Sequence, residues 1–382
     1  MTASPQPVPP PPDGFDDLLV EFLATVLDID DPLPALPAAA SLDDWPAATA
    51  ALVARAGPTA RQRRFDRERR FAQALATAAP AVTTDSLPAF ANQRISVRPV
   101  DVLRAGGGED LCYLKINHGF WEQLYAIFGV NDPARMRVRD PGLFRRRYVE
   151  SGFLEALAAA IGLVARADGE RLAFPGIRFG VSLASGTHDH PDVLAGFATR
   201  EPREQKIVIG AAIGLASWWE AFFPGSRPDF CDGSFPKQGL LSGRLRETLL
   251  EAAGDAARIV FVVPPHLAGV RLLGTPLPQE TVLVPAETVH ESWAAGLAAV
   301  GGHVMGRLAG EGRVVLITQS AVFSALLGCF LADARRRLLP REARLHFFDL
   351  GQALDVAAPA AGGPWSRRHA AGAESLFQID PR

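Results

Sequence analysis

The sequence is poor in several features that mark particular protein classes. Its 382 residues include three cysteines, Cys112, Cys231 and Cys329. They are odd in number and far apart, so they predict neither a disulfide framework nor a thiolate zinc site. The longest uncharged apolar run, 207–219, has thirteen residues, whereas a helix needs about 18 or more to cross a bilayer. The first residues also lack the segments of a signal peptide. We therefore expect a cytoplasmic protein with no membrane span.

Neither sign of charge is in excess. The chain has 39 Lys and Arg against 42 Asp and Glu, a formal net charge of −3. Such a balance argues against a protein that binds nucleic acid through its overall field. Lysine itself is nearly missing, because Lys115, Lys206 and Lys237 are the three lysines of the chain.

Composition changes along the chain predict four parts. Residues 1–14 are Pro-rich and predict a disordered tail. Residues 15–95 carry apolar positions at helical spacing and predict a small helical region. Residues 96–356 hold the main domain, and residues 357–382, rich in Gly, Ala and Pro, predict a flexible tail.

Short apolar runs recur through the main domain. They lie at 111–116, 177–183, 259–263, 281–284, 314–318 and 345–350. Buried parallel strands have this composition, and helical segments at 290–308 and 320–333 separate the later runs. The pattern predicts an α/β fold with a mostly parallel sheet and helices on both faces.

Ligands of an open α/β sheet bind beyond the carboxyl ends of its strands, so the residues after each run are site candidates. Of the eight histidines, five fall there: His118, His188, His190, His266 and His290. Loops attract polar residues in general, but the clustering predicts a site at this edge.

The first run is followed by Asn117, His118 and Gly119. Gly119 permits either a close backbone approach to a ligand or a plain tight turn. Glu122 lies in the next helical turn, where a carboxylate acts as a metal ligand or general base, or only favours the helix dipole.

A pattern typical of metal ligands follows the second run. His188 and His190 are alternate residues of an extended segment, so their imidazoles point the same way and could share an ion. No third ligand is spaced nearby, which leaves a surface loop as the alternative.

A phosphate site is predicted after the run that ends at Thr318. Gln319 and Ser320 open a helix there, and the N–H groups of a helix start suit a phosphate, although Ser320 is equally an N-cap candidate. The sequence contains neither GxGxxG nor GxxxxGK[ST], so the usual dinucleotide and P-loop sites lose support. Lys237 ends a predicted loop over 231–237, where it meets either a phosphate or water.

Five segments share their order with one known family: YLKINHG at 113–119, IVFVVP at 259–264, VLVP at 282–285, VLITQSA at 315–321 and FDLGQ at 348–352. From about residue 110 to 356 they resemble the GT-D type of bacterial glycosyltransferase. The resemblance implies a GT-D/Rossmann-like parallel sheet, a nucleotide-sugar donor, and Mn²⁺ or Mg²⁺ held by a D-x-E motif.

The chain departs from this family where the metal would bind. The D-x-E positions read His118, Gly119 and Phe120, with Glu122 two residues on, and Gln352 replaces the closing histidine of the family. Three outcomes stay open: Glu122 and His118 bind the metal, or His118 and Lys237 stabilise the leaving diphosphate without one, or the domain binds donor without turnover.

The leading prediction is a glycosyltransferase of glycan biosynthesis that moves a sugar from a nucleotide-diphosphate donor to a glycan or protein acceptor. Such a transfer needs positive charge or N–H groups where negative charge develops on the leaving diphosphate. The predicted catalytic residues are His118, Glu122 and Lys237. The predicted donor contacts are Asn117, Gly119, Gln319, Ser320, Asp349 and Gln352.

Two alternatives stay open. The first is a non-catalytic sugar-nucleotide-binding or scaffold module on a degenerate transferase fold. The second is a metal-dependent α/β hydrolase that uses His188, Asp189, His190 and Glu122.

Overall fold

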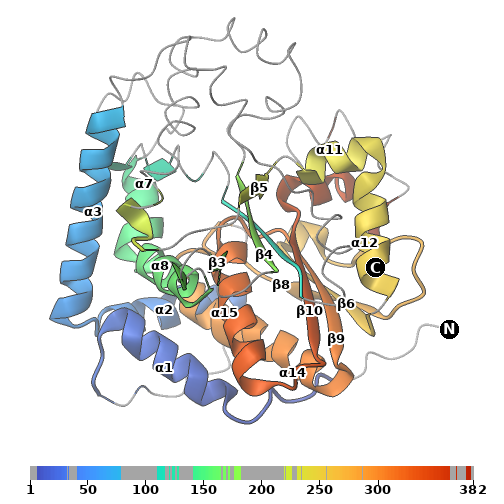
Figure 1. Ribbon diagram of the computed structural model, residues 1–382, viewed down its shortest axis with the longest axis horizontal. Coiled ribbons are helices and arrows are strands. Elements are labelled where there is room, and N and C mark those ends of the chain that lie inside the picture. The colour runs from blue at the N-terminus through green and yellow to red at the C-terminus, as the bar shows by residue number, and fades with distance from the viewer. Residues whose placement is uncertain are drawn as a thin grey trace, which may run out of the picture.

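The protein has an α/β fold in which helices flank a central parallel sheet (Figure 1). A computed structural model describes residues 7–31, 33, 41–78, 110–116, 120, 123–124, 127–128, 141–164, 167–168, 171–172, 176–181, 219, 221–225, 230–233, 235–254, 256–285, 287–361, 367 and 376–379. Among the helices of these residues, none combines the length and the apolar character that crossing a membrane requires.

The central sheet has seven strands in the order β5-β4-β1-β10-β9-β6-β8. Their bounds are β1 Cys112–Lys115, β4 Ile177–Val181, β5 Phe230–Asp232, β6 Arg258–Val263, β8 Gln279–Leu283, β9 Arg313–Thr318 and β10 Arg344–Asp349. Every pairing between neighbours is parallel. The predicted α/β class with a parallel sheet is therefore confirmed.

The inner strands β1, β6, β9 and β10 are largely apolar on both faces, which explains why their sequences read as continuous apolar runs. In β6, Val260 and Val262 enter one core, while Ile259, Phe261 and Val263 enter the other. Successive side chains of a strand point to opposite faces, and a parallel sheet is buried on both. Strands β1, β9 and β10 divide their residues between the two cores in the same way.

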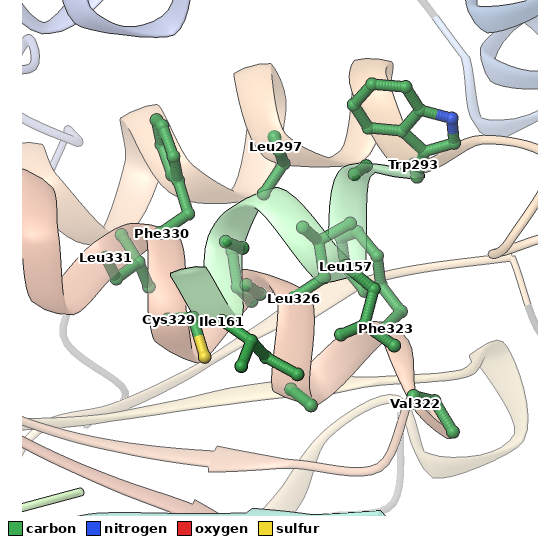
Figure 2. Packing of buried hydrophobic residues seen from close by; sticks show 14 of the residues in the cluster. Leu157, Ile161, Trp293, Leu297, Val322, Phe323, Leu326, Cys329, Phe330 and Leu331 are labelled. Carbon is green, nitrogen blue, oxygen red and sulfur yellow. The ribbon is translucent and has the colours of Figure 1, made fainter. Parts of the chain in front are cut away.

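One face carries the larger core. Its helical elements are α1 Phe15–Leu27, η1 Leu42–Asp44, α2 Trp45–Val53, α3 Pro58–Ala78, α7 Pro141–Arg145, η5 Arg146–Glu150, α8 Phe153–Val164, α13 Trp293–Gly296, η7 Leu297–Gly301, α14 Gly302–Glu311 and α15 Phe323–Leu338. Figure 2 shows Leu157 and Ile161 of α8 beside Leu326 of α15, with Trp293 and Leu297 farther from the sheet. Helix α8 thus joins the outer helix to the layer that lies on the sheet.

The opposite face carries a smaller core. It is covered by α11 Phe235–Ser242, α12 Arg244–Gly254, η6 Pro265–Leu267, β7 Val270–Leu272, η8 Gly351–Ala357 and β11 Phe377–Ile379. Strand β11 pairs antiparallel with β7. Residues 376–379, expected in a flexible tail, are therefore ordered by a strand that lies more than a hundred residues earlier. A separate pair, β2 Ala167–Asp168 and β3 Arg171–Leu172, completes the strands.

The N-terminal helices pack into the larger core instead of forming a separate unit. The rings of Phe15 and Phe22 in α1 contact Phe330 of α15, with centroid distances of 6.1 and 5.3 Å. Arg67 of α3 forms a buried ion pair with Glu155 of α8. The described part of the region 15–95 is thus continuous with the core of the main domain.

Part of the Pro-rich N-terminus, expected as a disordered tail, lies on α14. The carbonyl of Pro7 accepts a hydrogen bond from Arg307 Nη1 at 3.3 Å. A Cβ atom at Gly306 would overlap the carbonyl oxygen of Pro9. The missing side chain at Gly306 therefore allows the backbone of this segment to approach the helix closely.

One helical stretch is interrupted, and one predicted loop differs from the structure. The helical stretch over 141–164 breaks at Ser151 and Gly152, because Gly152 adopts a left-handed φ of +74°. The loop expected over 231–237 instead contains the end of β5 and the start of α11. Strand β5 has three residues, so its sequence holds no apolar run of detectable length; among the described residues it pairs with β4.

Candidate functional site

The carboxyl ends of β1, β10, β9 and β6 lie next to one another and carry a group of polar side chains. We call this group the rim: Lys115, Lys237, His266, Thr318, Gln319, Ser320, Ser324, Asp349, Gly351, Gln352 and Asp355. The chain leaves β6 toward β8 but leaves β9 toward β10, in opposite directions along the sheet. A crevice opens at such a reversal, and ligands of open α/β sheets bind there.

A buried carboxyl group lies at the end of β10. Asp349 is 2% exposed, and its Oδ2 accepts the backbone N–H of Lys115 at 3.3 Å. The other oxygen, Oδ1, is buried and has no hydrogen-bond partner among the described residues. Burial raises the pKa of Asp349 to about 7, although the Lys115 ammonium and the neighbouring Lys115 N–H, Gly351 N–H and Ser324 hydroxyl act in the opposite direction. Asp349 therefore exchanges a proton near neutral pH.

The turn after β10 brings the Lys115 side chain against the backbone. Gly351 adopts a φ of +52°, a left-handed conformation that glycine adopts without steric cost. A Cβ atom at this position would lie 2.9 Å from Lys115 Nζ. Glycine is thus needed at this turn for its conformation and for the space that the ammonium group occupies.

A second lysine reaches the rim from α11. Lys237 Nζ donates a hydrogen bond to Gln352 Oε1 at 3.0 Å. Burial lowers the pKa of Lys237, the nearby Lys115 ammonium lowers it further, and Asp355 opposes both. Two of the three lysines in the chain are therefore close enough to repel each other at one edge of the sheet.

A hydroxyl cluster links β9 to α15. The Oγ1 of Thr318 donates to Ser324 Oγ at 2.9 Å, and Ser320 Oγ lies 2.8 Å from the same atom. Helix α15 begins at Phe323 without a side-chain cap, so the N-cap interpretation of Ser320 is wrong. Ala321 between them has a φ of +51°, a conformation that non-glycine residues rarely adopt.

A histidine–aspartate pair connects the end of β6 to η8. His266 Nε2 lies 3.1 Å from Asp355 Oδ1, and Gln319 Nε2 donates to the same oxygen at 2.6 Å. The His266 side chain is 31% exposed, whereas that of Asp355 is 8% exposed. The His266 imidazole is therefore partly open to solvent, and the nearly buried Asp355 carboxylate fixes its orientation.

The structure brings five of the predicted site residues to the rim. They are Lys237, Gln319, Ser320, Asp349 and Gln352. The other predicted residues, Asn117, His118, Gly119, Glu122, His188 and His190, lie outside the described residues. The roles assigned to all of them from the sequence remain predictions.

The described residues do not fit the implied Mn²⁺ or Mg²⁺. Within the ranges given above, no three His, Cys, Asp or Glu side chains lie together as a metal would require. The two carboxylates of the rim, Asp349 and Asp355, already accept hydrogen bonds from protein groups. We therefore derive no chemical step through a metal.

Sequence reasoning assigned no role to six members of the rim: Lys115, His266, Thr318, Ser324, Gly351 and Asp355. His266 had a signal, because it is one of the five histidines that follow apolar runs, but nothing near it in the sequence indicated its role or its partner. Asp355 lies one turn beyond Gly351 in η8, and its partner His266 precedes it by 89 residues.

Comparison of the chain with protein-family models, with curated proteins and with solved structures gives no match. The rim therefore has to be interpreted from its own chemistry.

Proposed function

We propose that the protein is a glycosyltransferase with a GT-D/Rossmann-like domain, which moves a sugar from a nucleotide-diphosphate donor to a glycan or protein acceptor. The observation that carries this proposal is the pair of ammonium groups at the rim. Lys115 and Lys237 come from elements more than a hundred residues apart. The positive charge of Lys115 disfavours the charged form of Lys237. An anion bound between them would relieve that repulsion.

A diphosphate leaving group suits this arrangement. When the bond from the anomeric carbon to the diphosphate breaks, negative charge develops on the departing oxygen. Fixed cations at that point stabilise the transition state without reorganising. Partial burial strengthens the effect, because the local dielectric is lower than in bulk water. Lys115 and Lys237 are the described residues that supply this charge.

Neither alternative gains a specific observation in its favour. A binding module would use the same two lysines, so it differs from the enzyme only in turnover. The hydrolase would use His188 and His190, which lie outside the described residues.

Nucleotide binding tests the proposal. We would titrate the protein with UDP, GDP and their sugar conjugates by isothermal calorimetry, and then repeat the titration with Lys237→Ala. Loss of one charge-assisted contact should weaken binding of the nucleotide that binds by about 10- to 100-fold. Arg70→Ala is the matched control, because it removes one positive charge from an exposed position on α3, far from α11 (Figure 1).

Two results would contradict the proposal: no binding of any of these nucleotides to the wild type, or equal affinity in Lys237→Ala. Release of free nucleotide from a sugar donor, followed by chromatography, separates the enzyme from the binding module. We expect the transferase to release nucleotide slowly with water as the acceptor, whereas a binding module returns the donor intact.

A further inference from the structure

The His266–Asp355 pair fixes which nitrogen of the imidazole is basic. An ionised carboxylate only accepts hydrogen bonds, so the nitrogen that bonds it carries the proton. That nitrogen is Nε2, at 3.1 Å from Asp355 Oδ1. The neutral ring then has its lone pair on Nδ1. A histidine held in one tautomer by a carboxylate is the arrangement that a general base requires.

The surroundings hold Asp355 in place rather than compete for the histidine. Gln319 Nε2 donates to the same carboxylate oxygen at 2.6 Å, from the turn after β9. Lys237 of α11 is close enough to Asp355 for a favourable charge interaction. Asp355 therefore accepts from one neutral donor and balances one cation while it orients His266.

The pair shares η8 with the lysine site. Gln352, which accepts from Lys237, and Asp355, which bonds His266, lie three residues apart in this one short helix. The His266 ring and the two ammonium groups thus lie at the same edge of the sheet, at the carboxyl ends of β6, β9, β10 and β1. A base and a leaving-group site are needed on the two sides of one reacting carbon.

We infer that His266 is the general base that activates a hydroxyl acceptor, with Asp355 as its positioning residue; this inference rests on the proposed function. His266 Nδ1 takes the hydroxyl proton as the acceptor oxygen forms its bond to the anomeric carbon. The bond from that carbon to the diphosphate breaks, and its electron pair stays on the diphosphate oxygen near Lys115 and Lys237. The imidazolium then loses its proton to water.

The test uses water as the acceptor, since water is a hydroxyl nucleophile that any donor-loaded enzyme meets. We would measure release of UDP or GDP from the sugar donor that binds, together with the affinity for that donor. His266→Ala should lower the turnover rate by about 10²- to 10⁴-fold and leave donor affinity unchanged. Added imidazole should restore part of the lost rate.

A matched control is His303→Ala. His303 Nε2 also lies beside a carboxylate, Glu280 Oε1 at 2.8 Å, but at the amino ends of the strands. This variant loses the same group and should release nucleotide at the wild-type rate.

Asp355→Asn tests the positioning role by a measurement that does not depend on turnover. Nitrogen-15 NMR of the His266 ring should show the Nε2–H tautomer in the wild type. In Asp355→Asn it should show a mixture, because an amide can donate to the ring as well as accept from it.

The outcomes separate the two claims. The inference is overturned if His266→Ala releases nucleotide at the wild-type rate, or if its slower release is fully explained by weaker donor binding. Either result leaves the proposed function standing. The Nδ1–H tautomer in the wild type also overturns the inference, as does a wild type that binds donor without releasing nucleotide. No nucleotide binding by the wild type overturns both claims.

Discussion

Replacement of Asp349 by asparagine should stabilise the protein at neutral and alkaline pH. Burial raises the pKa of this carboxyl group from 3.8 to about 7. Above both values the folded state must hold a desolvated carboxylate, and a shift of about three units corresponds to about 4 kcal/mol. The amide of Asp349→Asn keeps the size and an oxygen that accepts the Lys115 N–H, but it carries no charge at any pH.

The sign of the pH dependence follows from proton binding. Between pH 3.8 and about 7 the folded wild type keeps a proton on Asp349 that the unfolded chain has released. The free energy of unfolding contributed by this group is therefore fully present below pH 3.8 and is lost as the pH rises through 7. The stability advantage of Asp349→Asn should grow by roughly 2–3 kcal/mol between pH 5 and pH 8.

Urea unfolding followed by circular dichroism at pH 5, 6.5 and 8 measures this difference. Asp43→Asn is the matched control, because it makes the same replacement at an exposed position in η1. A stability difference for Asp349→Asn that stays constant with pH, or reverses at pH 8, would refute the reasoning. It would mean that the carboxylate is stabilised by Lys115 more than it is destabilised by burial.

Three further predictions concern the glycines and the ion pairs. Gly351→Ala should cost about 1–2 kcal/mol of stability at its φ of +52° and also weaken nucleotide binding in calorimetry by displacing Lys115. Gly312→Ala, at a φ of +77° with no atom within 4 Å of the new Cβ, should cost stability but keep that affinity. Glu280→Gln should cost about 3 kcal/mol at pH 7 in urea unfolding, because the buried Arg307 loses the carboxylate that accepts two of its hydrogen bonds and keeps a longer ion pair with Glu311. Burial alone would raise the pKa of Glu280, but His303 and Arg307 hold it at about 2, so this difference should be largest above pH 4.5 and shrink toward pH 2. Gly306→Ala should lower the free energy of unfolding of the full chain by about 1–2 kcal/mol, because the new Cβ overlaps Pro9. The same substitution in a chain lacking residues 1–12 should cause no such loss.

The strands of the sheet were largely predictable because each carries its own signal. Six of the seven central strands lie on the apolar runs identified in the sequence, within a few residues. A strand buried on both faces needs continuous apolar residues, and this pattern is visible in the sequence of the strand itself. Strands β5, β7 and β11 have three residues each, which is too short for a recognisable pattern in the sequence. They form strands because they pair with a neighbouring strand, as β11 does with β7.

The candidate site was predictable only where position after a strand was enough. Asp349, Gln319 and Ser320 directly follow or end strands, so the parallel topology itself brings them together. The His266–Asp355 pair depends on how η6 and η8 pack across the edge, and no local spacing encodes that contact. The burial of Asp349, which sets its proton affinity, is likewise a property of the folded core.

The two edges of the sheet differ in a way that bears on function. At the amino ends of the strands, Glu280 binds Arg307 and His303, and neighbouring charges are of opposite sign. At the carboxyl ends, Lys115 and Lys237 repel each other, Asp349 is buried with a raised pKa, and Ala321 adopts a left-handed backbone. Each feature of the second edge opposes folding, and such features persist in proteins where a site requires them. Their concentration at one edge agrees with the anion site proposed above, whereas the opposite charges of the amino edge stabilise the fold.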